Sequence, residues 1–124
     1  MSEISMFVDK DDYQIIAAGT TLFKEGDPGD SMYFVEEGEV EISIHGKYIE
    51  TVGEGGILGE LALISSEVSK HRRSATAVAK TSCKVVAINE KRFTHLVQQT
   101  PLFALQIMRV LADRLHRWDD YLAN

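Results

Sequence analysis

Hydrophobic and polar residues alternate with a period of two through much of the first half of the chain. In the segment 38–45, GEVEISIH, the side chains of Val40, Ile42 and Ile44 point to one side and the polar residues between them point to the other. Turn-forming residues separate such segments at short intervals, as in EGDPGDS before MYFVEE and in HGK after the strand at 40–44. Short strands joined by tight turns predict an antiparallel sandwich or barrel.

The period of the pattern changes after Gly55. The segment LGELALISS offers one or two helical turns, and SATAVA and CKVVAI then return to the composition of strands. We therefore expect a short helix inserted between strands. Asn89 is placed to cap a helix over EKRFTHLVQQ, and Thr100 followed by Pro101 indicates the start of a second helix.

The final helix has an apolar stripe whose members recur at alternating steps of four and three: Ala104, Met108, Leu111, Leu115, Trp118 and Leu122. This spacing is typical of a coiled-coil seam and favours a partner helix. A helix packed against its own sheet would also need an apolar stripe. Ile107 and Val110 lie beside the stripe and are available to pack on the domain itself.

Length and composition limit the possible functions. At 124 residues, with 44% apolar and 26% charged residues, the chain is expected to form one globular domain over 1–124. The net charge of −6 disfavours nucleic acid and anionic membranes as partners. Cys83, the single cysteine, lies in an apolar run and is expected to be a buried, inert thiol. The N-terminal segment has no features of a signal peptide, so we expect a soluble, cytoplasmic protein.

The segment 55–79, GGILGELALISSEVSKHRRSATAVA, holds the candidate chemistry. Its glycines allow close approach of a ligand to the backbone, Glu60 interrupts an apolar run, and Arg72 and Arg73 form a basic pair before a strand. An anionic sugar phosphate would satisfy all three features. Taken singly, each has a simpler interpretation: a turn for the glycines, stabilisation by the helix dipole for Glu60, and a solvated surface for the arginines.

GELAL followed by RRSATAV resembles the phosphate-binding cassette of cyclic nucleotide-binding domains, the family of the bacterial catabolite activator protein and the regulatory subunits of protein kinase A. EGDPGDSMYFVEEGEVEI is similar to the Gly-Asp turn and the following strand of that family. The resemblance implies a mainly β fold with flanking helices, a jelly-roll-like β-roll (double-stranded β-helix) of eight strands with a short cassette helix and C-terminal helices. The implied segments are helical 1–13, a β-roll over 14–88 with its cassette at 56–78, and helices over 89–124.

The resemblance also implies a ligand and a set of contacts. Arg73 would pair with the cyclic phosphate and Glu60 would bind the ribose 2′-hydroxyl. The backbone amides of Gly59 and Glu60, with Ser74 and Ala75, would complete the phosphate cradle. Ser74 after the arginine is compatible with cAMP, which is favoured over cGMP.

The chain departs from the family pattern at several positions. Leu58 stands where many members have Phe, and Arg72 stands where many have Pro. The stretch before the arginines is long enough that either arginine could reach the phosphate. Leu58, Leu61 and Arg72 are therefore kept as site candidates, and Trp118 is a candidate to cover the base or to lie in a dimer seam.

These observations predict a small regulatory or sensor module that binds a cyclic nucleotide and transmits binding through its C-terminal helix. A homodimer through helix 101–122 and an unidentified downstream protein are the expected partners. No metal-ligand spacing links the four histidines, and no enzyme activity or resident metal is expected. The alternative is a domain of the same fold that binds no nucleotide and acts through protein contacts. Because the chain ends at YLAN, a transcription factor is disfavoured unless this is a fragment.

Overall fold

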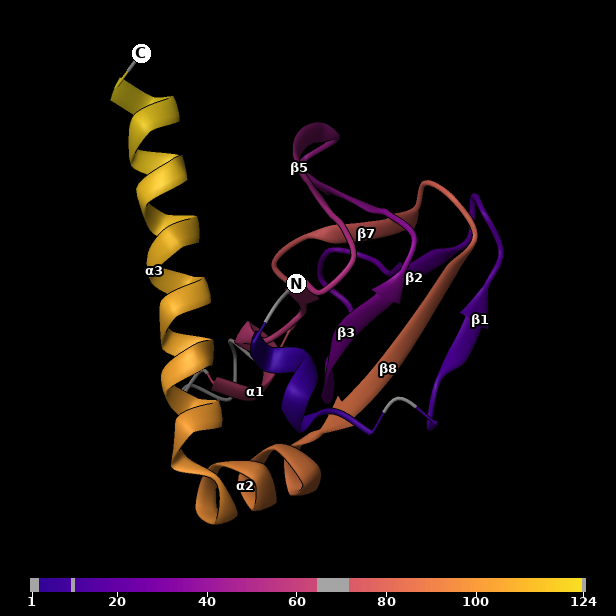
Figure 1. Cartoon of the computed structure of the whole chain (residues 1–124). Coiled ribbons are helices and arrows are strands. Elements are labelled where there is room, and N and C mark those ends of the chain that lie inside the picture. The colour runs from indigo at the N-terminus through magenta and orange to yellow at the C-terminus, as the bar shows by residue number, and fades with distance from the viewer. Residues whose placement is uncertain (1–2, 10, 65–71, 124) are drawn as a thin grey trace.

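Two antiparallel sheets of four strands each form a β-roll, and helices cover one side of it (Figure 1). The computed structural model describes residues 3–9, 11–64 and 72–123. One sheet has the strand order β1-β8-β3-β6 and the other has the order β2-β7-β4-β5. The prediction of an antiparallel sandwich with a jelly-roll-like topology is confirmed, because each sheet joins strands from distant parts of the sequence.

The strands are short, as the spacing of turn residues predicts. Their bounds are β1 Gln14–Ile16, β2 Thr21–Phe23, β3 Ser31–Glu37, β4 Val40–Ile44, β5 Lys47–Val52, β6 Ile57–Leu58, β7 Thr76–Ala79 and β8 Cys83–Asn89. Val40 and Ile42 are buried on the inner face of β4, as the alternation in GEVEISIH predicts.

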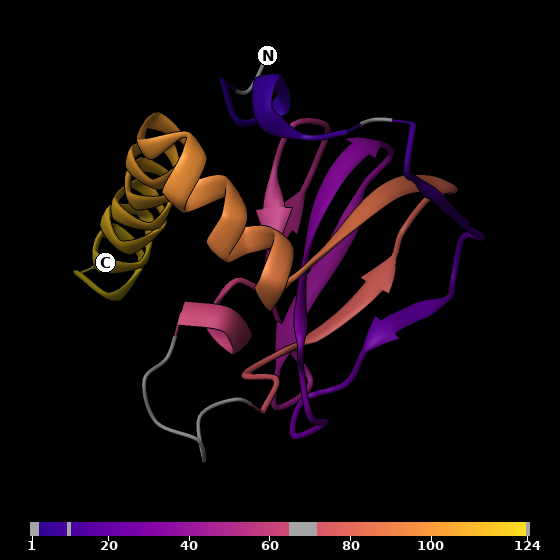
Figure 2. The ribbon, with the colours of Figure 1, turned by 90° about the horizontal axis from the view of Figure 1, so that it is seen from below.

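The helices have the bounds η1 Glu3–Phe7, α1 Leu61–Ile64, α2 Glu90–Gln99 and α3 Pro101–Ala123. The short helix α1 lies between strands β6 and β7, and Asn89 caps α2 by accepting a hydrogen bond from the Arg92 backbone N–H at 2.8 Å. Both predictions are confirmed. Within the segment 1–13, the described helical part is a five-residue 3-10 helix, η1. Helices α2 and α3 lie on the same side of the β-roll (Figure 2).

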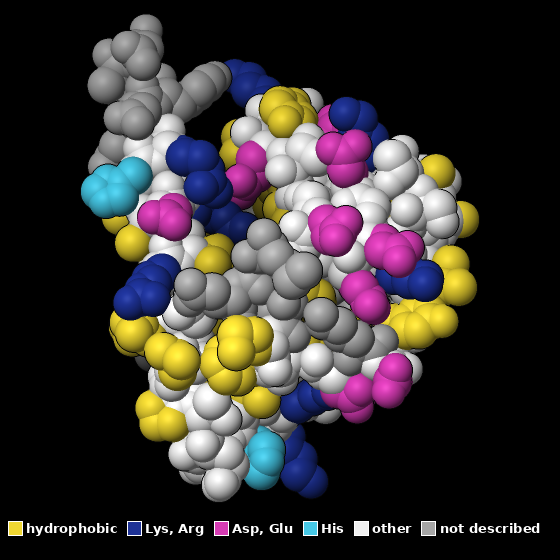
Figure 3. All heavy atoms as spheres, in the orientation of Figure 1, with side chains coloured by type: hydrophobic (Ala, Val, Ile, Leu, Met, Phe, Trp, Pro, Cys, Tyr) yellow, Lys and Arg dark blue, Asp and Glu magenta, His cyan; other side chains and the backbone are white. Residues whose placement is uncertain are grey.

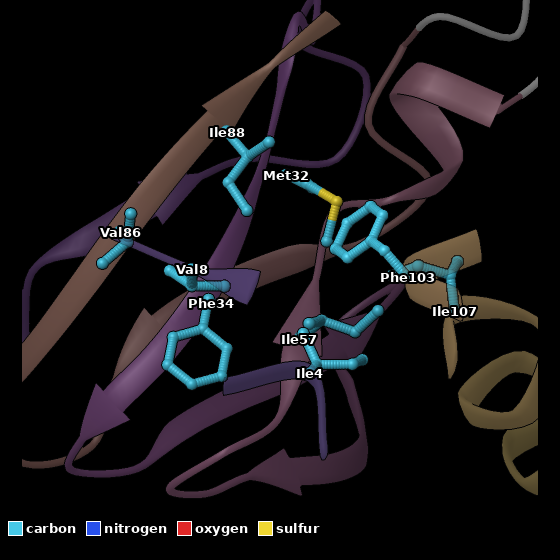
Figure 4. Packing of buried hydrophobic residues seen from close by; sticks show 9 residues of the cluster. All are labelled: Ile4, Val8, Met32, Phe34, Ile57, Val86, Ile88, Phe103 and Ile107. Atoms are coloured by element: carbon cyan, nitrogen blue, oxygen red, sulfur yellow. The ribbon is translucent and has the colours of Figure 1, made fainter. Parts of the chain in front are cut away.

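The core has two parts, and strands β3 and β8 contribute to both. Met32 and Phe34 of β3 face a cluster shared with η1 and α3, whereas Val35 packs in the second cluster, together with buried residues of β4 and β7. Figure 4 shows the side chains of the first cluster directed toward one another. The sheet that contains β3 and β8 is therefore covered on both faces. This explains the nearly continuous apolar run of β8, which includes the buried, free Cys83.

Helix α3 packs on the core with residues beside the predicted seam and with one seam residue, Leu111. Phe103 and Ile107 are buried in the first cluster, and Val110 and Leu111 are packed against it. Two seam residues, Met108 and Leu115, are 58% and 61% exposed. The side chains of the two seam residues closest to the end of the helix, Trp118 and Leu122, lie outside the described part of the structure. No described helix is long and apolar enough to cross a membrane.

Candidate functional site

A hollow lies where the cassette turn, the sheet of β4 and β5, and α3 meet. Its lining combines four charged side chains with a larger number of apolar ones: Phe23, Ile42, Ile44, Glu50, Val52, Leu58, Gly59, Glu60, Leu61, Ala62, Arg73, Ser74, Ala75 and Arg114. Figure 3 shows acidic and basic side chains gathered between the upper part of α3 and the β-roll. A mostly apolar hollow with a few convergent polar groups is the usual form of a small-molecule site.

Arg73 is a buried cation in this hollow. It is 6% exposed, and its Nη1 donates a hydrogen bond to the Gly59 carbonyl oxygen at 3.1 Å. Its guanidinium carbon lies 4.2 Å from the centre of the Phe23 ring, which gives a cation–π contact. Its Nε is buried and has no hydrogen-bond partner among the described residues. A buried donor of this kind costs free energy unless a ligand supplies a hydrogen-bond acceptor for it.

The backbone beside Arg73 leaves room for the guanidinium. A Cβ atom on Gly29 would lie 2.6 Å from Arg73 Nε, and a Cβ on Gly59 would lie 2.7 Å from Arg73 Nη1. Gly59 also has a φ of +78°, in the left-handed region that favours glycine. The two glycines therefore leave the space that the guanidinium occupies, because a side chain on either residue would collide with it.

Burial lowers the pKa of Arg73 from its usual value, while Tyr33, Asp30 and Asp27 act in the opposite direction. A guanidinium keeps its proton in proteins at neutral pH. The hollow therefore presents a fixed positive charge that is only partly solvated. Such a charge attracts an anion more strongly than a solvated surface arginine does.

Glu60 is the second buried charge. Its side chain is 4% exposed and Oε1 accepts a hydrogen bond from Arg114 Nη1 of α3. Arg114 Nη2 also donates to the Ile57 carbonyl oxygen at 2.7 Å. The carboxylate that interrupts the apolar run is thus balanced by a cation from a residue 54 positions later in the chain. An ionised carboxylate has about four acceptor positions, so Glu60 can also accept hydrogen bonds from hydroxyl groups of a ligand.

The other candidate residues of the cassette divide into two groups. Leu58, Leu61, Ser74 and Ala75 line the hollow with Gly59. Arg72 does not line it. The Arg72 side chain is exposed and donates to the Gly26 carbonyl oxygen at 3.1 Å. Of the adjacent arginines, the structure therefore brings only Arg73 into the hollow. The Trp118 side chain and residues 65–71 lie outside the described part of the structure.

The sequence analysis did not predict the lining residues Phe23, Glu50 and Arg114, the apolar lining residues of β4 and β5, Ala62 of α1, or Gly29 beside Arg73. Phe23 and Gly29 belong to a strand and a turn that fold back over Arg73. Arg114 lies beside the apolar stripe of α3, where an arginine is ordinarily a solvated residue. The inward position of Glu50 could have been predicted from the sequence, because alternation along β5 places it on the same face as the buried Val52.

The model of the cyclic nucleotide-binding domain matches residues 13–100, which include the β-roll, the cassette and α2. The chain belongs to the cyclic nucleotide-binding domain family. Such a domain is a regulatory module, and the prediction of this family from the cassette residues is confirmed. Among the described residues, no group of three or more His, Cys, Asp or Glu side chains could hold a metal ion.

Individual relatives agree with this family assignment. The fold is similar to that of the Thermus thermophilus catabolite activator protein, with a TM-score of 0.79 and 26% identity, over 97% of this chain and 55% of that one. A structure from a cyclic-GMP-dependent signalling pathway in bacterial phytopathogenesis gives a TM-score of 0.73 and 26% identity, over 92% of this chain and 89% of that one. The cyclic nucleotide-binding domain is also 38% identical over 85 residues to the cGMP-dependent protein kinase, isozyme 2, of Drosophila melanogaster. That match covers 68% of this chain but only 7% of the kinase.

Proposed function

We propose that this domain senses a cyclic purine nucleotide in the hollow around Arg73. The cyclic phosphate binds the Arg73 guanidinium, and the ribose 2′-hydroxyl donates a hydrogen bond to Glu60. The backbone amides of Gly59 and Glu60, with Ser74 and Ala75, complete the contacts to the phosphate. The observation that carries the proposal is the buried Nε of Arg73, a charged donor with no partner among the described residues.

The site offers one route by which binding is transmitted to the rest of the protein. Glu60 contacts both the proposed ribose position and Arg114 of α3. A nucleotide that binds one position of α3 more tightly than another shifts the population of that position by the difference in affinity. The domain then acts as a sensor whose output is the placement of α3.

The proposed contacts of the phosphate and the ribose do not determine whether the base is adenine or guanine. Ser74 is compatible with cAMP, whereas two of the relatives described above are named for cGMP. The proposed function includes both nucleotides.

The test is isothermal titration calorimetry of the 124-residue chain with cAMP and cGMP. Arg73→Ala should weaken binding of every cyclic nucleotide at least tenfold, because a hydrogen bond to a charged group contributes about 1.5 to 3 kcal/mol. Arg72→Ala is the matched control, since it removes an adjacent arginine that does not line the hollow. Equal affinities for the wild type and Arg73→Ala would contradict the assignment of the phosphate site.

Thermal unfolding separates this proposal from a domain that acts only through protein contacts. A ligand that binds only the native state stabilises it by about 2.7 kcal/mol at one hundred times its dissociation constant. The unfolding midpoint of the wild type should therefore rise with cAMP or cGMP. An unchanged midpoint with both nucleotides would favour the protein-interaction function.

We also propose that α3 pairs with α3 of a second copy. Met108 and Leu115 occupy seam positions and are mostly exposed, so a partner helix would remove them from water. Sedimentation equilibrium with and without nucleotide should detect a dimer in at least one state. A monomer under both conditions at high micromolar concentration would exclude this assembly.

A further inference from the structure

An acidic side chain occupies an inward-facing position on β5. Ile42 pairs directly with Glu50 across β4 and β5, and Val40 pairs with Val52 in the same ladder. Directly paired residues project from the same face of a sheet, so Glu50 faces the same side as the buried Ile42 and Val52. An apolar residue would pack well at this position, and a carboxylate there needs polar partners.

The known contacts of Glu50 leave part of its hydrogen-bonding capacity unused. Oε1 lies 3.0 Å from Arg114 Nε, and Oε2 lies 3.3 Å from Arg117 Nη2. The first contact lacks the alignment of a hydrogen bond, since Arg114 Nε remains a buried donor with no hydrogen-bond partner among the described residues. Each carboxylate oxygen can accept two hydrogen bonds. Glu50, which lines the hollow and is 19% exposed, can therefore accept further donors from a ligand.

A chain of contacts links the charged groups that line the hollow. Arg73 contacts the carbonyl group of Gly59, the residue before Glu60. Arg114 contacts Glu60 and also Glu50. A cyclic nucleotide carries its ribose between its phosphate and its base. If the phosphate lies on Arg73 and the ribose on Glu60, the base extends toward Glu50.

The surroundings of Glu50 suit the ring of a base. Ile42, Ile44 and Val52 line the same end of the hollow and provide apolar contacts for its face. Glu50 is the acidic group among the lining residues of β4 and β5, and it is placed to contact the polar edge of the ring.

We propose that Glu50 is a specificity-determining residue that favours guanine over adenine. A carboxylate only accepts hydrogen bonds, and guanine presents two adjacent donors, N1–H and the 2-amino group. Two parallel bonds to one carboxylate are a strong, directional arrangement. Adenine presents one donor, its 6-amino group, beside the lone pair of N1, which a carboxylate repels. This inference rests on the proposed function, because it assumes that the phosphate and ribose bind as described above.

The test compares cGMP, cIMP and cAMP by calorimetry on the 124-residue chain. The base of cIMP keeps N1–H but lacks the 2-amino group, so the three ligands offer two, one and no donors of the guanine pattern. We expect cGMP to bind at least about tenfold more tightly than cAMP, with cIMP between them. Glu50→Gln should weaken cGMP at least about tenfold and cAMP less than about threefold, because the amide replaces one acceptor by a donor.

Glu41→Gln is the control variant, since it removes the same charge from the opposite face of β4, across from Thr51. The ligand series on the wild type tests the inference even if Glu50→Gln does not fold, which its thermal unfolding would reveal. Equal or tighter binding of cAMP by the wild type would overturn the role of Glu50, as would an equal loss of cAMP and cGMP in Glu50→Gln. If the wild type binds none of the three ligands, the proposed function itself fails, and this inference fails with it.

Discussion

Arg72 and Arg73 are neighbours in the sequence but have different environments. Arg73 lines the hollow, whereas Arg72 pairs with Pro28 in an isolated β-bridge and its side chain is exposed. The sequence predicts the pair, but composition alone does not choose between them. The similarity of RSATAV to the family strand favours Arg73, and Arg73 is the arginine that lines the hollow.

Gly29 provides a test of the space around Arg73. We predict that Gly29→Ala weakens nucleotide binding at least tenfold, because the new Cβ would lie 2.6 Å from Arg73 Nε and 2.9 Å from the Cβ of Ala62. Calorimetry with the tighter-binding cyclic nucleotide measures the effect.

Gly53→Ala is the matched control, because a Cβ there meets no atom within 4 Å. If both glycine variants bind nucleotide with the same affinity as the wild type, the guanidinium tolerates displacement and Gly29 has no role in its placement.

Glu50 and Arg114 show which parts of a site are visible in a sequence. The alternation along β5 indicates that Glu50 faces inward, since Val52 does. The arginine that contacts it gives no comparable signal, because the pairing depends on where α3 lies after the chain has folded. Contacts between residues 64 positions apart, as in this pair, are set by the tertiary structure.

At the scale of elements, helix boundaries follow from local chemistry. Asn89 begins α2 with a side chain that accepts the Arg92 N–H, and Pro101 begins α3 directly after Thr100. Both starts were predicted because capping involves residues close in sequence. The face of α3 that packs on the core was harder to predict, because the core residues Phe103 and Ile107 lie beside a stripe of apolar residues with more regular spacing.

The cap of α2 has a measurable effect on stability. We predict that Asn89→Ala lowers the free energy of unfolding by about 0.5 to 2 kcal/mol, since it leaves the Arg92 N–H without its 2.8 Å partner. Urea denaturation followed by circular dichroism measures this change. Gln99→Ala, at an exposed position of the same helix, should change it by less than about 0.5 kcal/mol. Equal effects of the two substitutions would show that the cap contributes nothing specific.

At the scale of the whole molecule, the two-part core joins the helices to the β-roll. Phe103 of α3 is fully buried, and its ring meets those of Phe7 and Phe93 edge to face, with centroids 6.0 Å and 5.7 Å away. The period-two pattern predicts the strands that build this core. It does not predict which strands become neighbours, because pairings such as β1 with β8 join opposite ends of the β-roll.

Phe103 is the residue whose loss should affect the whole fold most directly. We predict that Phe103→Ala lowers the free energy of unfolding by about 3 to 5 kcal/mol, because it removes a large side chain and leaves a cavity among three elements. This is a large part of the stability of a typical domain. Leu102→Ala, one residue earlier and 50% exposed, should have a much smaller effect in the same denaturation experiment. A loss below 1 kcal/mol for Phe103→Ala would contradict the packing described above.

Helix α3 is attached to the β-roll by two kinds of force at different points along its length. Phe103, Ile107, Val110 and Leu111 of the helix pack on the core, and farther along it Arg114 and Arg117 contact acidic side chains and one carbonyl group. Added salt screens the contact of Arg117, whose side chain is 57% exposed, much more than the buried contacts of Arg114, and it leaves hydrophobic contacts intact or stronger. Ionic strength therefore acts mainly on the contact of Arg117, and the electrolyte content of the surroundings changes how firmly this part of the helix is held without changing its apolar base.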